Sequence, residues 1–66
     1  MNERIKELRK HLNMNQDSFG KRLGVTGPAV SRMESGDRQP SDQVILSICR
    51  EFGVNEIWLR TGEGDM

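Results

Sequence analysis

QDSFGKRLGVTGPAVSRMES, residues 16–35, is the stretch that decides the fold. Its Gly20, Gly24 and Val30 have the spacing that two short helices need to meet at a steep angle. Gly20 removes the side chain where the helices cross, although glycine costs a helix interior about 1 kcal/mol relative to alanine. Gly24 can adopt the positive φ of a tight turn, and Val30 fills the angle between the helices. The spacing predicts a helix-turn-helix unit; a generic helical hairpin that never touches DNA is the alternative.

Capping residues set the limits of these two helices. Asn15 is a suitable N-cap for the first, which ends at Gly24. Thr26 is a suitable N-cap for the second, and Pro28 fits a first turn, where no N–H is needed. Because proline disfavours a helical residue before it, the same residues also allow a start after Gly27. Ser35-Gly36 ends this helix.

Three further helices are expected around the unit. Apolar residues three and four apart predict an amphipathic helix over residues 4–12. Ser41 and Asn55 are N-caps for a helix ending at Gly53 and for a short last helix. No stretch alternates long enough for a strand. The prediction is an all-α fold of five short helices in one domain, residues 1–62, with residues 63–66 a frayed tail or the start of a linker to a further domain.

The amino-acid composition excludes several classes of function. With one cysteine and one histidine, the 66 residues offer no disulfide, zinc site or catalytic triad. We therefore expect no enzyme activity, metal or cofactor. No apolar run is long enough for a membrane span, and residues 1–4 do not open a signal peptide, which together predict a cytoplasmic protein.

The charge is unevenly distributed. The net charge of zero counts against a nucleic-acid binder. Residues 1–38, however, hold eight basic and five acidic groups (+3), whereas residues 39–66 hold two and five (−3). The field at a surface matters more than the sum. A polarised molecule and a chance split in a short chain account for this pattern equally well.

The sequence resembles the phage-repressor-like helix-turn-helix proteins, also called the xenobiotic response element family. The resemblance lies in residues 16–25 and 30–36, in Pro40-Ser41, and in residues 52–55 with Trp58-Leu59, and it extends over residues 4–62. It implies a lambda-repressor-like fold of five helices, with the third helix in the major groove of double-stranded DNA. It also implies a transcriptional regulator, most often a bacterial or phage repressor.

The sequence departs from the family at several positions. The family usually has alanine at Gly20, leucine at Phe19, asparagine at Ser35 and glycine at Asn13. The departure that matters is Gly27-Pro28, because several relatives carry base-reading amides there. Glycine and proline cannot read a base edge through a side chain, so direct readout would be sparse.

Two groups of DNA contacts are expected. Gln16 lies where exposed N–H groups favour a phosphate, and the start of the fourth helix offers a second such place. Thr26, Ala29, Ser31 and Arg32 are expected on the outer face of the third helix, with Gly27 and Pro28 letting the backbone approach the groove. The predicted phosphate contacts are Gln16, Arg38, Gln39 and Ser41, and the predicted base contacts are Thr26, Gly27, Pro28, Ala29, Ser31 and Arg32. A solvated surface is the alternative for Gln16, Ser31 and Arg38. Several family members use the position of Ser31 only for packing or water contact.

The other notable residues are expected to be structural. Arg9 and Glu34 match family positions that form a partly buried ion pair, against the alternative of two unrelated surface charges. Trp58 is expected to close the core rather than to bind a partner. Cys49 is expected in the core and His11 at the surface.

The sequence thus predicts a DNA-binding regulator that acts as a homodimer on a symmetric operator. The alternative is an antitoxin or an adaptor that uses the same fold to bind a protein, which zero net charge and Gly27-Pro28 both favour.

Overall fold

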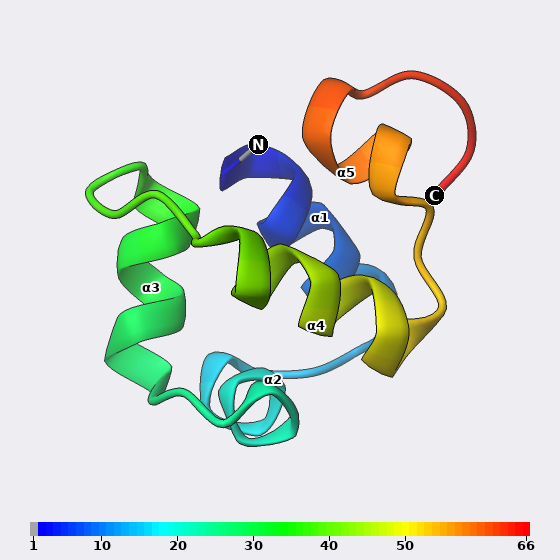
Figure 1. Cartoon of the computed structure of the whole chain (residues 1–66). Coiled ribbons are helices and arrows are strands. Elements are labelled where there is room, and N and C mark those ends of the chain that lie inside the picture. The colour runs from blue at the N-terminus through cyan, green and yellow to red at the C-terminus, as the bar shows by residue number, and fades with distance from the viewer. Residues whose placement is uncertain (1) are drawn as a thin grey trace.

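The computed structural model describes residues 2–66, and in this range the chain forms five α-helices (Figure 1). They are α1 (Asn2–His11), α2 (Gln16–Leu23), α3 (Gly27–Ser35), α4 (Asp42–Phe52) and α5 (Glu56–Thr61). α2 and α3 lie at one end of the molecule, and α5 lies at the other with the C-terminal residues. The predicted all-α class and five helices are confirmed. Met1, the first residue of the predicted domain, lies outside the described residues.

The predicted N-caps are all present, and each side chain satisfies a main-chain N–H that the helix leaves unpaired. A cap of this kind stabilises a helix by about 1 kcal/mol. The pairs are Asn15 with the N–H of Ser18 (2.7 Å), Thr26 with Ala29 (3.2 Å), Ser41 with Val44 (3.2 Å) and Asn55 with Ile57 (3.0 Å).

One helix limit differs from the prediction, and one of the two starts allowed for α3 is now decided. α1 covers residues 2–11 rather than 4–12, because Asn13 takes a left-handed φ of 58° and the helix unwinds before it. α3 begins at Gly27, as the Thr26 cap predicted, although a proline follows directly. The clash that usually prevents this involves the Cβ of the preceding residue. Glycine has no Cβ, so Gly27 adopts the helical conformation.

The C-terminal residues fold back instead of fraying. The N–H of Asn55 donates to the carbonyl of Met66 at 2.9 Å, and the Met66 side chain packs against the core. Positive φ values at Gly62 and Gly64 allow this reversal. Arg4 also donates to the carbonyls of Leu59 and Arg60, both at 2.9 Å, which fastens the end of α5 to α1.

A single core contains the apolar faces of the five helices that the structure describes. Trp58 is 7% exposed, so its predicted place in the core is confirmed, whereas its neighbour Ile57 is 60% exposed. Cys49 is half-buried, and burial raises the pKa of its thiol. The core residues are Ile5, Leu8, Phe19, Val30, Met33, Ile45, Ile48, Val54, Trp58 and Leu59.

The bend between α2 and α3 depends on Gly20. A Cβ built on this residue would lie 2.6 Å from the carbonyl oxygen of Val25 and 3.1 Å from that of Thr26. The N–H of Val25 in turn donates to the carbonyl of Gly20 at 2.9 Å. Gly24 has the expected left-handed φ of 77°, and Val30 is fully buried in the angle. The predicted helix-turn-helix geometry is therefore confirmed.

We expect Gly20→Ala to lower the free energy of unfolding by about 1–2 kcal/mol, because a methyl group would press on main-chain oxygens that cannot rotate away. This net loss already includes the gain of about 1 kcal/mol in helix propensity. Urea unfolding measures the change, with Lys21→Ala, an exposed position of the same helix, as the control. A Gly20→Ala variant as stable as the wild type would show that the crossing is looser than described.

Candidate nucleic-acid interface

The outward face of α3 carries four of the predicted base-contacting residues. Thr26, Pro28, Ser31 and Arg32 are all exposed. α3 holds them at fixed spacing, because its opposite face is anchored in the core by Val30 and Met33. These four residues form what we call the α3 face.

The predicted outward position of Ala29 is wrong. Ala29 is only 8% exposed. It precedes Met33 by four residues, and residues four apart lie on the same side of a helix. Because Ala29 and Val30 both point inward, the buried stripe of α3 is wider than the sequence pattern indicated.

Gly27 also does not face outward. It is buried against the start of α2, where a Cβ on Gly27 would overlap Oδ1 of Asp17 and lie 3.5 Å from the Cα of Asp17. The Asp17 side chain thus occupies the space of a Cβ at position 27, and a larger residue there would require this side chain to move. The sequence reasoning missed Asp17 as a neighbour of the α3 face. A glycine in the first turn of α3 was the available signal.

The predicted phosphate-contacting residues lie at two helix starts. Gln16 is half-buried at the first position of α2, and its Nε2 donates to Oε1 of Glu34 at 3.2 Å. Arg38, Gln39 and Ser41 are exposed in the segment between α3 and α4. The N–H of Arg38 donates to the carbonyl of Arg32 at 3.2 Å, so this segment turns back toward α3.

The predicted ion pair between Arg9 and Glu34 is present and mostly buried. Nε of Arg9 lies 2.6 Å from Oε2 of Glu34, and Nη2 lies 3.2 Å from Oε1, which makes the pair bidentate. The two side chains are 13% and 5% exposed. Nη1 of Arg9 donates to the carbonyl of Met14 at 2.9 Å. With the Gln16 contact, this network fixes the start of α2 relative to α1 and α3.

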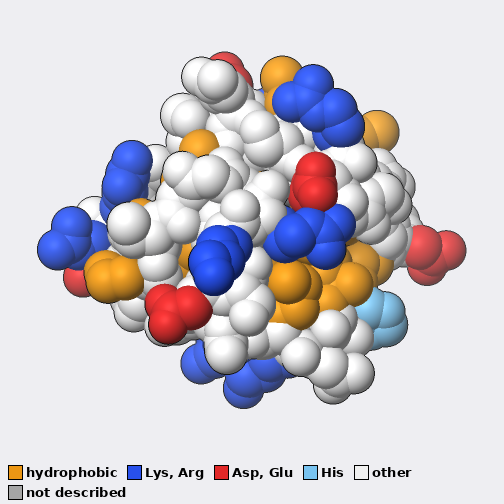
Figure 2. Space-filling model, turned by 90° about the horizontal axis from the view of Figure 1, so that it is seen from below, with side chains coloured by type: hydrophobic (Ala, Val, Ile, Leu, Met, Phe, Trp, Pro, Cys, Tyr) orange, Lys and Arg blue, Asp and Glu red, His pale blue; other side chains and the backbone are white. Residues whose placement is uncertain are grey.

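Charge on the surface is unevenly neutralised. Arg22 pairs with Glu51 at 2.8 Å, and Arg60 pairs with both Asp42 and Glu56. Within residues 2–66, Arg32 and Arg38 have no ion-pair partner and remain available to an anion. Figure 2 shows the molecule from the α2 end, with Lys and Arg side chains spread over this face and Asp and Glu side chains interspersed among them. Local positive charge thus exists despite a net charge of zero.

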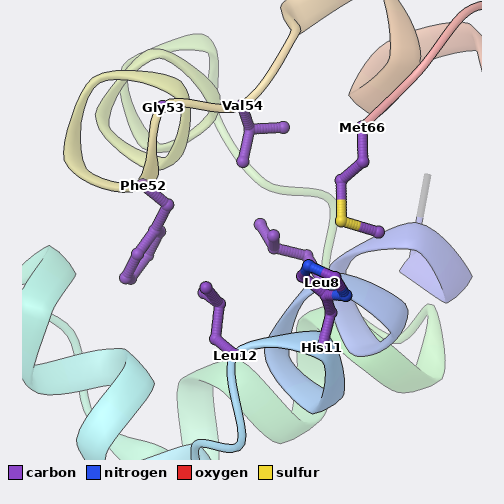
Figure 3. Close-up of a pocket in the computed structure, with 7 residues that line it drawn as sticks. All are labelled: Leu8, His11, Leu12, Phe52, Gly53, Val54 and Met66. Carbon is purple, nitrogen blue, oxygen red and sulfur yellow. The ribbon is translucent and has the colours of Figure 1, made fainter.

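A small apolar cavity of about 210 Å³ lies elsewhere, between the ends of α1 and α4 and the C-terminal residue (Figure 3). Phe52 faces it from the end of α4 and Leu12 from the turn after α1, and the Met66 side chain lies over Leu8 and His11. None of its lining residues belongs to α3. No helix in the part of the chain that the structure describes has the length and hydropathy needed to cross a bilayer.

Comparison with known proteins places this geometry in a family. Residues 5–59 match the model of a family described as helix-turn-helix. The chain is 37% identical to the propionyl-CoA carboxylase regulator of Cereibacter sphaeroides over 94% of its length, but it spans only 13% of that protein. It is also 37% identical to the uncharacterized HTH-type transcriptional regulator YgzD of Bacillus subtilis, covering 82% of each chain.

A phage repressor is similar in both sequence and structure. The chain is 30% identical to repressor protein C2 of Salmonella phage P22 over 96% of its length, and it spans 29% of that protein. A crystal structure of the P22 c2 repressor in complex with synthetic operator 9T superposes with a TM-score of 0.85 at 29% identity, covering 94% of each chain. The resemblance stated from the residues is therefore confirmed.

These relatives are regulators or repressors, and the fold is the one seen in the P22 repressor. This chain belongs to the helix-turn-helix family, as a P22 c2 repressor-like domain of the kind that DNA-binding transcriptional regulators carry.

Proposed function

We propose that the chain is a sequence-specific DNA-binding repressor that inserts α3 into the major groove. The observation that carries this proposal is the α3 face: one side of α3 is fixed in the core, and the other presents exposed polar side chains next to unpaired positive charge. A major groove about 12 Å wide admits one helix. Arg32 is the residue suited to pair with guanine O6 and N7. The P22 repressor bound to its operator supports the same use of this fold.

Phosphate contacts on both sides of α3 would hold the helix in the groove. Gln16 uses one Nε2 hydrogen on Glu34, and the amide has a second hydrogen to offer to a phosphate at the start of α2. Arg38, Gln39 and the N–H of Ser41 would hold a phosphate on the other side, where the start of α4 adds its dipole. Phosphate contacts of this kind position a protein without specifying sequence.

The size of the domain supports binding as a homodimer. The longest extent of the domain is 28 Å, whereas the half-sites of a symmetric operator lie about 34–36 Å apart. One copy therefore covers one half-site, and two copies related by a two-fold axis cover a palindrome. Repression would result from blocking polymerase at such a site.

Selection of bound sequences from a random pool of duplex DNA tests the proposal. We expect a palindrome, with affinity for it falling steeply as salt rises, by a slope of about −0.9 per phosphate neutralised by a basic side chain. A protein that binds no DNA even at low salt would instead be an adaptor or an antitoxin, and the proposal would fail.

Two substitutions separate positioning from readout. Arg32→Ala should lower the preference for the selected site over a scrambled one by about 1–3 kcal/mol, because the guanine contact is lost. Gln16→Ala should weaken binding to both sites about equally and leave the salt slope unchanged, because an amide carries no charge. Titration of both DNAs with both variants gives the comparison. Equal losses in the two variants would contradict this division of roles.

A further inference from the structure

Gly27 has no side chain, and the space that one would fill is occupied by Asp17 of α2. Oδ1 of Asp17 lies where a Cβ of Gly27 would stand, and Cγ of Asp17 is 3.0 Å from that point. Asp17 is exposed, at the second position of α2, and Gly27 is the first residue of α3. A carboxylate from α2 is therefore placed beside the first turn of the helix that, as proposed above, enters the groove.

Neither Gly27 nor Pro28 has a side chain that can form a hydrogen bond with a base near the start of α3. Thr26 uses its hydroxyl oxygen to cap α3 at 3.2 Å from the N–H of Ala29. Pro28 has neither an N–H nor a polar side chain. Asp17 thus supplies a hydrogen-bond acceptor that Gly27 and Pro28 lack.

The chemistry of a carboxylate limits which base it can read. An ionised carboxylate only accepts hydrogen bonds. In the major groove, cytosine presents the N4 amino donor, whereas guanine presents two acceptors, N7 and O6. Adenine places its N7 acceptor next to the N6 donor, and thymine offers an acceptor and a methyl group. Cytosine is the base whose edge complements a carboxylate without an opposing acceptor.

We propose that Asp17 is a specificity-determining residue that accepts a hydrogen bond from N4 of a cytosine near the start of α3. This inference rests on the proposed DNA-binding function. The negative charge also repels acceptor-rich base edges such as that of guanine, so it strengthens discrimination by penalising wrong sites. Asp17 of α2 thereby contacts a base that Gly27, which has no side chain, cannot contact from α3.

The test compares sequences selected from random duplex DNA by the wild type and by Asp17 variants whose folding is verified by circular dichroism. The wild type should enrich cytosine at one position of each half-site, by about fivefold over other bases. Asp17→Ala should lose the preference at that position alone. Asp17→Asn should change it to adenine, because an amide pairs with adenine N6 and N7 together.

Two further variants distinguish base reading from a general effect of charge. Gly27→Ala keeps the carboxylate but displaces it, and it should blur the same position. Asp37→Ala removes an exposed acidic group from the α3–α4 segment and should leave every selected position unchanged. A cytosine preference that persists in Asp17→Ala overturns this inference and leaves the proposed function standing. A wild-type protein that enriches no sequence overturns both.

Discussion

Replacing Glu34 with alanine is expected to lower the free energy of unfolding by about 3–5 kcal/mol, because it leaves the guanidinium of Arg9 buried without its partner. Arg9 is 13% exposed and donates to both carboxylate oxygens. A domain of this size is stable by roughly 3–10 kcal/mol, at about 0.05–0.15 kcal/mol per residue. The substitution should therefore remove a large part of its stability. Urea unfolding followed by circular dichroism measures the change.

Two further variants test whether the loss in Glu34→Ala comes from a buried, unpaired charge. Glu51→Ala removes the exposed partner of Arg22; the side chain of Glu51 is 41% exposed and that of Arg22 is 49% exposed. This substitution should lower the free energy of unfolding by less than about 1 kcal/mol. The double variant Arg9→Met with Glu34→Leu should be more stable than Glu34→Ala, since apolar side chains of similar volume need no partner. If Glu34→Ala lost no more stability than Glu51→Ala, the pair would be as solvated as a surface one.

Local sequence signals fixed much of the fold, because caps and turns depend on neighbouring residues. Asn15 and Asn55 each cap a helix through an N–H within three residues, and the left-handed turn at Gly24 needs only a missing Cβ. Such features can be read from the chain without knowing what packs on it. The pairing of Arg9 with Glu34 is not local, and it was expected only through the family resemblance.

The parts that were missed depend on packing between distant segments. Whether Ala29 points inward depends on how wide a stripe of α3 is covered by other helices, and its own neighbours in sequence do not fix that width. Met66 returns to the start of α5 because the core accepts its side chain. The approach of Asp17 to Gly27 likewise arises from the crossing of two helices. These contacts decide which residues remain exposed for DNA.

Phe19→Ala is the second substitution with a large expected effect, about 3–5 kcal/mol of unfolding free energy. Phe19 is fully buried in α2, and its ring stacks on that of Phe52 with centroids 5.0 Å apart. The guanidinium of Arg22 lies 5.1 Å from the centroid of Phe52, so this ring contacts both Phe19 and Arg22. Removing the Phe19 side chain opens a cavity between α2 and α4. The packing of α4 on α2 at this point holds α2 in place.

The size of the residue at position 19, rather than its aromatic character, should govern stability. Phe19→Leu keeps most of the buried volume and should cost about 1–1.5 kcal/mol, within the range for apolar replacements of similar size. Thermal unfolding of the two variants should show Phe19→Ala melting well below Phe19→Leu, since 1 kcal/mol corresponds to roughly 4–8 °C in a domain of 60–100 residues. Equal losses would mean that the stacking on Phe52, which leucine cannot replace, outweighs the filling of space. Because α2 positions the start of α3, the loss of support at Phe19 should also weaken DNA binding in the fraction that remains folded.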